Sequence, residues 1–164
     1  QKEGNYLGPH SDKHLLYADW TKRDSTLVTK DVFEKDLRDN YLAMEKSGLK
    51  IEEPRYFIPP YEWYNRQISD WAKDLKVQVV NFTPGTGSNA DYTTPDMKSY
   101  KSSDTIYNNI LRYEEKNTLN GFMLLIHIGT HPDRTDKFYN RLDDLIKELK
   151  TRGYSFVRVD EMMK

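Results

Sequence analysis

The chain has 164 residues, which is enough for one domain with a sizeable core. Its 25 lysines and arginines nearly balance its 26 acidic residues, and the formal net charge of −1 does not indicate a nucleic-acid or membrane-surface partner. The absence of cysteine excludes disulfides, cysteine-bound zinc and thiol nucleophiles. No apolar run approaches the roughly 20 residues of a membrane span.

Two features of the composition leave alternatives open. The 12 Tyr, 6 Phe and 3 Trp suit the stacking of sugars, although an ordinary aromatic core is the simpler explanation. No signal peptide opens the printed sequence, which fits a cytoplasmic protein as well as one whose leader has been removed.

Amphipathic spacing predicts four helices in chain order. Phe33, Leu37 and Tyr41 recur at helical spacing in the first of them. Thr29 is its expected N-cap and Gly48 its expected stop. The helices are expected over residues 29–48, 62–75, a stretch through 106–111, and 138–149.

Short apolar runs between these helices predict strands. They are expected over residues 3–8, 55–58, 77–82, 121–129 and 154–159. Nearly continuous apolar strands that alternate with amphipathic helices are typical of a parallel sheet covered by helices. The predicted fold class is therefore α/β.

Polar residues follow each of the first four strands. His10 follows the first, Pro59–Glu62 the second, the polar stretch 83–102 the third, and His127–His131 the fourth. Functional groups of such folds collect at the carboxyl ends of the strands, so these residues are expected at one edge of the sheet.

The four histidines form two pairs with the same spacing. His10 and His14 can meet one metal ion if both rings point the same way, but catalytic zinc needs a third protein ligand. The alternative is a pair of ordinary polar residues. His127 ends an apolar strand, where it is either a satisfied core residue or a general acid near a metal-bound water. His131 is expected to be exposed or to cap a helix.

Quoted in chain order, four stretches resemble the motifs of the NodB-type polysaccharide deacetylases, carbohydrate esterase family 4. The stretch "HSDKH" is similar to the family's H-[ST]-x-x-H, and "IPPYE" to its R-P-P-Y-G. The "ADY" at Asp91–Tyr92 is a looser match to its Asp-aromatic pair, and "LLIH" is similar to its closing L-L-H.

The resemblance implies a partial, distorted (β/α) barrel that removes acetyl groups from N-acetylated, or sometimes O-acetylated, polysaccharide sugars. It implies that His10 and His14 bind a divalent metal, most often zinc, and that the backbone N–H of Tyr61 helps to hold the oxyanion. It also implies that His127 protonates the leaving amine and that Asp91 orients it. The substrate-binding residues that it implies are Leu125, Tyr92 and Trp63, with Leu125 lining the acetyl-methyl pocket.

Three departures from the family pattern shape the expectation. The T-F-D-D motif, whose aspartates serve as base and third metal ligand, has no counterpart before "HSDKH". Ile58 stands at the arginine position of R-P-P-Y-G, and Glu62 at the glycine position. We therefore expect residues 1–164 to be a single domain, the carboxyl-terminal portion of a deacetylase domain.

The resemblance also carries expectations about partners and location. An acetylated polysaccharide is the expected partner, and the protein is expected to be extracellular or periplasmic. Another segment, another chain or an oligomer is expected to cover the open sheet edge. A catalytically impaired carbohydrate-binding or scaffold domain of the same fold and an O-acetyl esterase are the alternatives.

Overall fold

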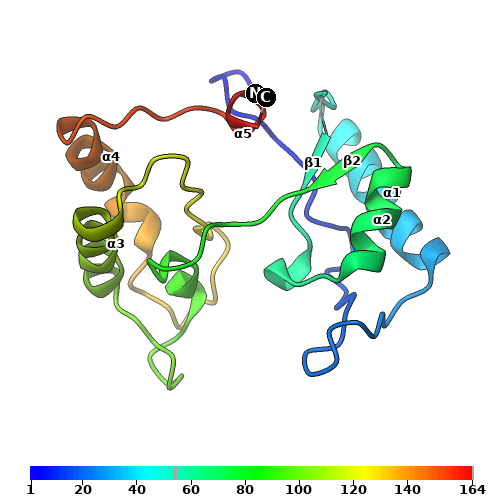
Figure 1. Cartoon of the computed structure of the whole chain (residues 1–164), viewed down its shortest axis with the longest axis horizontal. Coiled ribbons are helices and arrows are strands. Elements are labelled where there is room, and N and C mark those ends of the chain that lie inside the picture. The colour runs from blue at the N-terminus through cyan, green and yellow to red at the C-terminus, as the bar shows by residue number, and fades with distance from the viewer. Residues whose placement is uncertain (54, 164) are drawn as a thin grey trace. The chain divides into compact units, whose positions relative to one another are not determined.

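The computed structural model describes residues 1–53 and 55–163, which form two compact units. The first unit comprises the described residues of Gln1–Asn81 and Val157–Lys164, and the second comprises Phe82–Phe156. Figure 1 shows each unit with its own helices.

The first unit is an α/β structure built on two parallel strands. Its elements are α1 (Lys30–Lys46), β1 (Arg55–Phe57), the 3-10 turn η1 (Pro60–Glu62), α2 (Arg66–Asp74), β2 (Val77–Val79) and α5 (Val159–Met162). The strands pair in register, Arg55 opposite Val77 and Phe57 opposite Val79. The prediction of parallel strands is confirmed at 55–58 and 77–82, with shorter bounds.

Local sequence signals account for the two long helices of this unit. The Thr29 hydroxyl accepts the N–H of Val32, as predicted for an N-cap, and the Asn65 side chain caps α2 in the same way through Ile68. One face of each helix packs on the strands. The buried core is Tyr17, Phe33, Leu37, Phe57, Ile68, Ala72 and Val77.

The segment before the histidine pair lies against β1 without pairing to it as a strand. The backbone N–H of Tyr56 donates to the Tyr6 hydroxyl at 2.8 Å. A Cβ at Gly8 would lie 2.8 Å from the carbonyl oxygen of Tyr56, so a side chain there would collide with the strand. The predicted strand 3–8 is therefore wrong, although its residues lie beside β1. Cover of the sheet edge by a further segment or chain stays a prediction.

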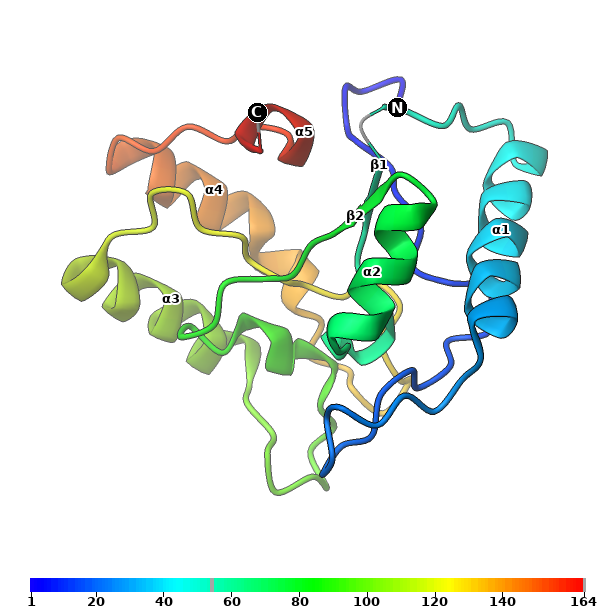
Figure 2. The ribbon, with the colours of Figure 1, turned by 45° about the vertical axis from the view of Figure 1, so that its right-hand side comes forward.

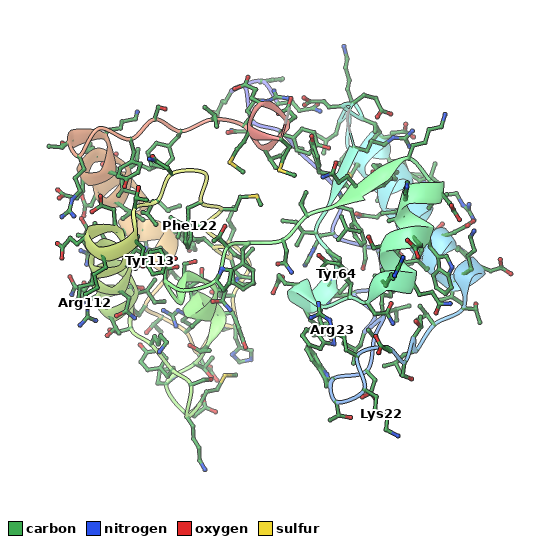
Figure 3. All side chains as sticks on the ribbon, in the orientation of Figure 1. Lys22, Arg23, Tyr64, Arg112, Tyr113 and Phe122 are labelled. Atoms are coloured by element: carbon green, nitrogen blue, oxygen red, sulfur yellow. The ribbon has the colours of Figure 1, made fainter. Side chains whose placement is uncertain are left out.

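The second unit is formed by helices and extended connections. Its elements are the 3-10 turn η2 (Ser88–Tyr92), α3 (Ser103–Asn117), the 3-10 turn η3 (Phe138–Arg141) and α4 (Leu142–Thr151). Its core is Ile106, Ile110, Leu119, Phe138, Leu145 and Leu149. The edge-on rings of Tyr113 and Phe122, labelled in Figure 3, pack beside this core with centroids 5.2 Å apart.

The described residues at 121–129 and 154–159 form no strand, so these two strand predictions are wrong. Figure 2 shows the connection between α3 and α4 as an extended trace. Phe122, Leu124 and Ile126 still pack on the core in the alternation of a strand. Thr83 donates its N–H to the carbonyl of Met123 at 2.9 Å, but no continuous ladder follows.

A buried arginine, Arg134, connects three backbone segments of the second unit by hydrogen bonds. Arg134 is 0 % exposed, and its guanidinium donates to three backbone carbonyls, those of Thr93 at 2.6 Å, Lys101 at 3.0 Å and Asp136 at 2.9 Å. Asp136 in turn accepts the N–H of Ser103, the first residue of α3, at 2.6 Å. Arg134 therefore joins the loop after η2 to the segment that begins α3.

Candidate functional site

The first part of the candidate site is the histidine loop, residues 10–14, which α1 holds in place. The N–H of His10 donates to Asn40 Oδ1 at 2.9 Å, and the N–H of Lys13 donates to Asp36 Oδ1 at 2.7 Å. The loop is tight, since Ser11 and His14 have φ of 79° and 52°. It brings the His10 and His14 rings to a centroid distance of 5.2 Å.

Asp36 is the main anchor of this loop, and its replacement is expected to destabilise the fold. Asp36 is buried and also accepts the Tyr17 hydroxyl at 2.6 Å; burial and then this bond raise the pKa of Tyr17 well above its ordinary value. Asp36→Ala leaves two donors without an acceptor, so we expect a loss of about 2 kcal/mol in the free energy of unfolding, measured with urea. Asp39→Ala, which removes a solvent-screened pair with Lys35, is the control and should change the free energy of unfolding by less than about 1 kcal/mol. Equal losses in the two variants would contradict the anchoring role.

The two imidazoles suit a divalent metal but do not complete a site. Nδ1 of His10 lies 2.8 Å from the carbonyl oxygen of Ile58, which only accepts, so Nδ1 carries the proton and Nε2 offers its lone pair. Within residues 1–53 and 55–163, no group of three or more His, Cys, Asp or Glu side chains could hold a metal ion. A third protein ligand of the kind that catalytic zinc requires is therefore not supplied by these residues.

The turn η1 places the predicted oxyanion residue beside the histidines. Tyr61 and Glu62 have φ of 59° and 53°, a left-handed conformation in which glycine is unstrained and other residues are not. Glu62 thus stands where the family motif has glycine, and its backbone has the left-handed conformation that glycine adopts without strain. The turn is held by the Asn81 side chain, which donates to the carbonyl of Glu62 at 2.8 Å. The Tyr61 ring lies 4.5 Å from that of His14, centroid to centroid.

Trp20 lies in the same part of the first unit and was not among the predicted site residues. Its ring centroid is 5.6 Å from that of Tyr61 and 5.5 Å from that of Trp63. The signal available in the sequence is weak, because a lone tryptophan in the polar run "ADWTKRD" has no helical or strand spacing.

The second part of the candidate site is a buried carboxylate paired with an imidazole. Asp91, in η2, is 1 % exposed, and its two oxygens face His127. Oδ2 accepts the backbone N–H of His127 at 2.7 Å, and Oδ1 lies 2.6 Å from the ring Nδ1. An ionised carboxylate only accepts, so Nδ1 carries the proton and the ring orientation is fixed. The Tyr92 ring stands edge-on to His127 at 5.5 Å.

The structure divides the predicted site residues between the two units. The first unit brings His10, His14 and Tyr61 together, with Trp63 next in the same turn. The second unit holds Asp91, Tyr92 and His127, together with the half-buried Leu125. His131 is exposed, as predicted.

Among the described residues, no helix is both long and apolar enough to cross a membrane.

Curated relatives match nearly the whole chain but are longer than it. No protein-family model matches. Two peptidoglycan-N-acetylglucosamine deacetylases of Bacillus cereus are 30% identical over 163 residues and 26% identical over 164 residues. Both matches cover 99% of this chain, and they cover 65% and 50% of the relatives. An uncharacterised protein of Bacillus subtilis is 26% identical over 162 residues, which are 42% of its length. The chain thus spans about two fifths to two thirds of these relatives.

Solved structures share the fold. A peptidoglycan N-acetylglucosamine deacetylase in complex with 4-naphthalen-1-yl-N-oxidanyl-benzamide has a TM-score of 0.71 at 23% identity, over 98% of this chain and 64% of its own. A pseudoenzyme of the CE4 family from Bacillus anthracis has a TM-score of 0.61 at 19% identity, over 96% of this chain and 46% of its own. These likenesses show an α/β fold with parallel strands that matches part of the barrel of these proteins.

Proposed function

Because this chain belongs to the polysaccharide deacetylases of carbohydrate esterase family 4, of which it spans only part, we propose that it serves the metal-dependent hydrolysis of acetyl groups from N-acetylated polysaccharide sugars. The relatives named for peptidoglycan make a cell-wall glycan the proposed substrate and the bacterial cell envelope, extracellular or periplasmic, the proposed location. We further propose that residues 1–164 are the carboxyl-terminal portion of one deacetylase domain.

The observation that carries this proposal is the Asp91–His127 pair. The buried carboxylate fixes the imidazole through Nδ1, so that a protonated ring carries its second, transferable proton on Nε2. Hydrolysis of an amide ends when the C–N bond breaks and the nitrogen takes a proton. We assign that proton to His127 Nε2, and to Asp91 the stabilisation of the imidazolium before transfer.

The remaining roles follow the arrangement in each unit. His10 and His14 are proposed as two ligands of a divalent metal, zinc by preference, whose third protein ligand comes from outside the described residues. The backbone N–H of Tyr61 is proposed to hold the oxyanion. Leu125 is proposed to contact the acetyl methyl group.

A second candidate function is a catalytically impaired carbohydrate-binding domain. Two observations favour it: the residues at 1–53 and 55–163 supply no third metal ligand, and Ile58 stands where the family motif has arginine. A solved structure with the same fold is described as a pseudoenzyme.

Replacing His14 tests the proposed function. His14→Ala removes one of two imidazole ligands, so we expect zinc affinity, measured by calorimetry on the full chain, to fall roughly 100-fold or more. His131→Ala, which removes an exposed histidine outside the proposed set, is the matched control and should bind zinc as the unmodified chain does.

The same preparations separate the two candidate functions. Release of free amine from β-1,4-linked N-acetylglucosamine oligomers with zinc present, abolished by His14→Ala, supports the deacetylase. Binding of zinc and of the oligomer without amine release, in a preparation that also contains the segment supplying the third ligand, supports the impaired domain. Zinc affinity that His14→Ala leaves unchanged overturns the metal assignment.

A further inference from the structure

The loop that carries Trp20, residues 17–27, is closed on itself. Ala18 and Thr26 form an antiparallel bridge, and the N–H of Leu27 donates to the carbonyl of Tyr17 at 2.8 Å. Inside the loop, an Asp19 carboxylate oxygen accepts the backbone N–H groups of residues 21 and 22, each at 2.7 Å. The backbone around Trp20 is therefore fixed by hydrogen bonds rather than by packing of the Trp20 ring.

The same loop is anchored to the segment that follows η1. Trp63 Nε1 donates to the carbonyl of Asp19 at 3.1 Å, and Arg23 Nε donates to the carbonyl of Tyr64 at 2.8 Å. Figure 3 labels Arg23 and Tyr64 in this part of the first unit. These bonds hold the loop against the turn that contains Tyr61.

A row of aromatic rings runs from the histidine pair to the loop. The ring of His14 contacts that of Tyr61, Tyr61 contacts Trp20 edge-on at 76°, and Trp20 lies beside Trp63 at an interplanar angle of 30°. The guanidinium carbon of Arg23 lies 4.2 Å from the centroid of Trp63. Trp63 therefore has both Trp20 and Arg23 against it and acts as their support.

The outer members of this row remain open to solvent. Trp20 is 55% exposed and Tyr61 is 46% exposed. Tyrosine and tryptophan side chains combine an apolar ring with a polar group and are enriched at binding surfaces. Two rings are too small an area for a stable protein–protein interface, which buries about 800 Å² on each partner.

We propose that Trp20 forms a stacking platform for one pyranose ring of a glycan chain, next to the histidine pair, and that the Tyr61 ring, which stands at 76° to it, forms the side wall of this subsite. This inference rests on the proposed function and extends it by placing a sugar-binding subsite. The C–H face of a pyranose presents an apolar surface of the size of an aromatic ring, whereas its hydroxyl groups accept hydrogen bonds. Arg23 forms no ion pair with a carboxylate in the described part of the chain, so its terminal nitrogens supply such donors at the edge of the platform.

Binding without metal tests the platform apart from catalysis. The probe is a β-1,4-linked oligomer of N-acetylglucosamine, titrated into the full chain in EDTA and followed by calorimetry. We expect Trp20→Ala to weaken binding about tenfold. Trp20→Phe keeps a stacking ring and should stay within about threefold of the unmodified chain. Leu42→Ala, which truncates a side chain of similar exposure on α1, is the matched control and should leave binding unchanged.

Two results would overturn the platform: no binding of the oligomer to the unmodified chain at millimolar concentration, or Trp20→Ala binding as tightly as Leu42→Ala. Circular dichroism of each variant shows that the fold is kept. EDTA removes metal, so the binding test does not depend on zinc. Weaker binding by Trp20→Ala would therefore support the platform even if His14→Ala left zinc affinity unchanged. In that case the platform holds and the proposed hydrolysis fails.

Discussion

Replacement of Arg134 by alanine is expected to unfold most of the second unit. The side chain is fully buried, and its loss leaves the carbonyls of Thr93, Lys101 and Asp136 without their donors, as well as a large cavity. Each unsatisfied buried group costs about 1 kcal/mol or more, so we expect a loss of about 4 kcal/mol. That approaches the whole free energy of unfolding of a marginally stable domain, about 5 kcal/mol.

Urea unfolding and hydrogen exchange of the α3 and α4 amides measure this effect. Arg134→Lys keeps the charge, but one ammonium cannot reproduce the planar fork that reaches three carbonyls, so an intermediate loss is expected. Arg112→Ala, an exposed arginine of α3 labelled in Figure 3, is the control and should change stability by less than about 0.5 kcal/mol. A loss below about 1 kcal/mol for Arg134→Ala would show that the three carbonyls do not need their donors.

The second large effect is expected from Asp91→Asn, which reverses the proton positions on His127. The asparagine oxygen can still accept the backbone N–H of His127, but its NH₂ group then faces Nδ1. Nδ1 must therefore accept, and the neutral ring carries its proton on Nε2 instead. If the proposed hydrolysis holds, amine release should fall about 100-fold or more, because the imidazolium loses its buried counter-charge.

Nitrogen-15 NMR of the histidine rings reads the tautomer directly and does not depend on turnover. The control is Asp133→Asn beside the exposed His131, whose Nδ1 lies 3.6 Å from the Asp133 carboxylate. That change should leave the His127 signals as they are. An unchanged His127 tautomer in Asp91→Asn would show that the carboxylate does not fix the ring.

The helices of this fold could be predicted from sequence because their signals are local. The Thr29 cap and the spacing of Phe33 and Leu37 lie within a few residues of the helix they form. The strands at 55–58 and 77–82 were predicted as well, but those expected at 3–8, 121–129 and 154–159 are not formed by the described residues, because a strand exists only where a neighbour completes its hydrogen bonds. Phe122, Leu124 and Ile126 pack on the core in the alternation of a strand, yet the hydrogen bonds between Thr83 and Met123 do not continue into a ladder.

The candidate site shows the same division. The closeness of His10 and His14 to Tyr61 was predictable in outline, since both stretches follow segments expected to lie side by side, although only the one before Tyr61 is a strand. The fixing of His127 by Asp91 depends on a loop of about 20 residues that brings the two side chains together, and only the motif order pointed to it. No motif pointed to Trp20. Its position depends on hydrogen bonds between loops, and these leave no periodic pattern in the sequence.

The Asp19 carboxylate, which accepts backbone N–H groups inside the Trp20 loop, also determines how the stability of that loop depends on pH. The backbone N–H of Lys22, followed by the hydroxyl and N–H of Thr21, holds the pKa of Asp19 below its ordinary value. A carboxyl with a depressed pKa keeps its full contribution above the ordinary pKa and loses it only as the pH falls through the lower, folded value. The hydrogen bonds of Asp19 therefore keep stabilising the loop in mildly acidic surroundings, where a histidine in the same place would already have gained a proton.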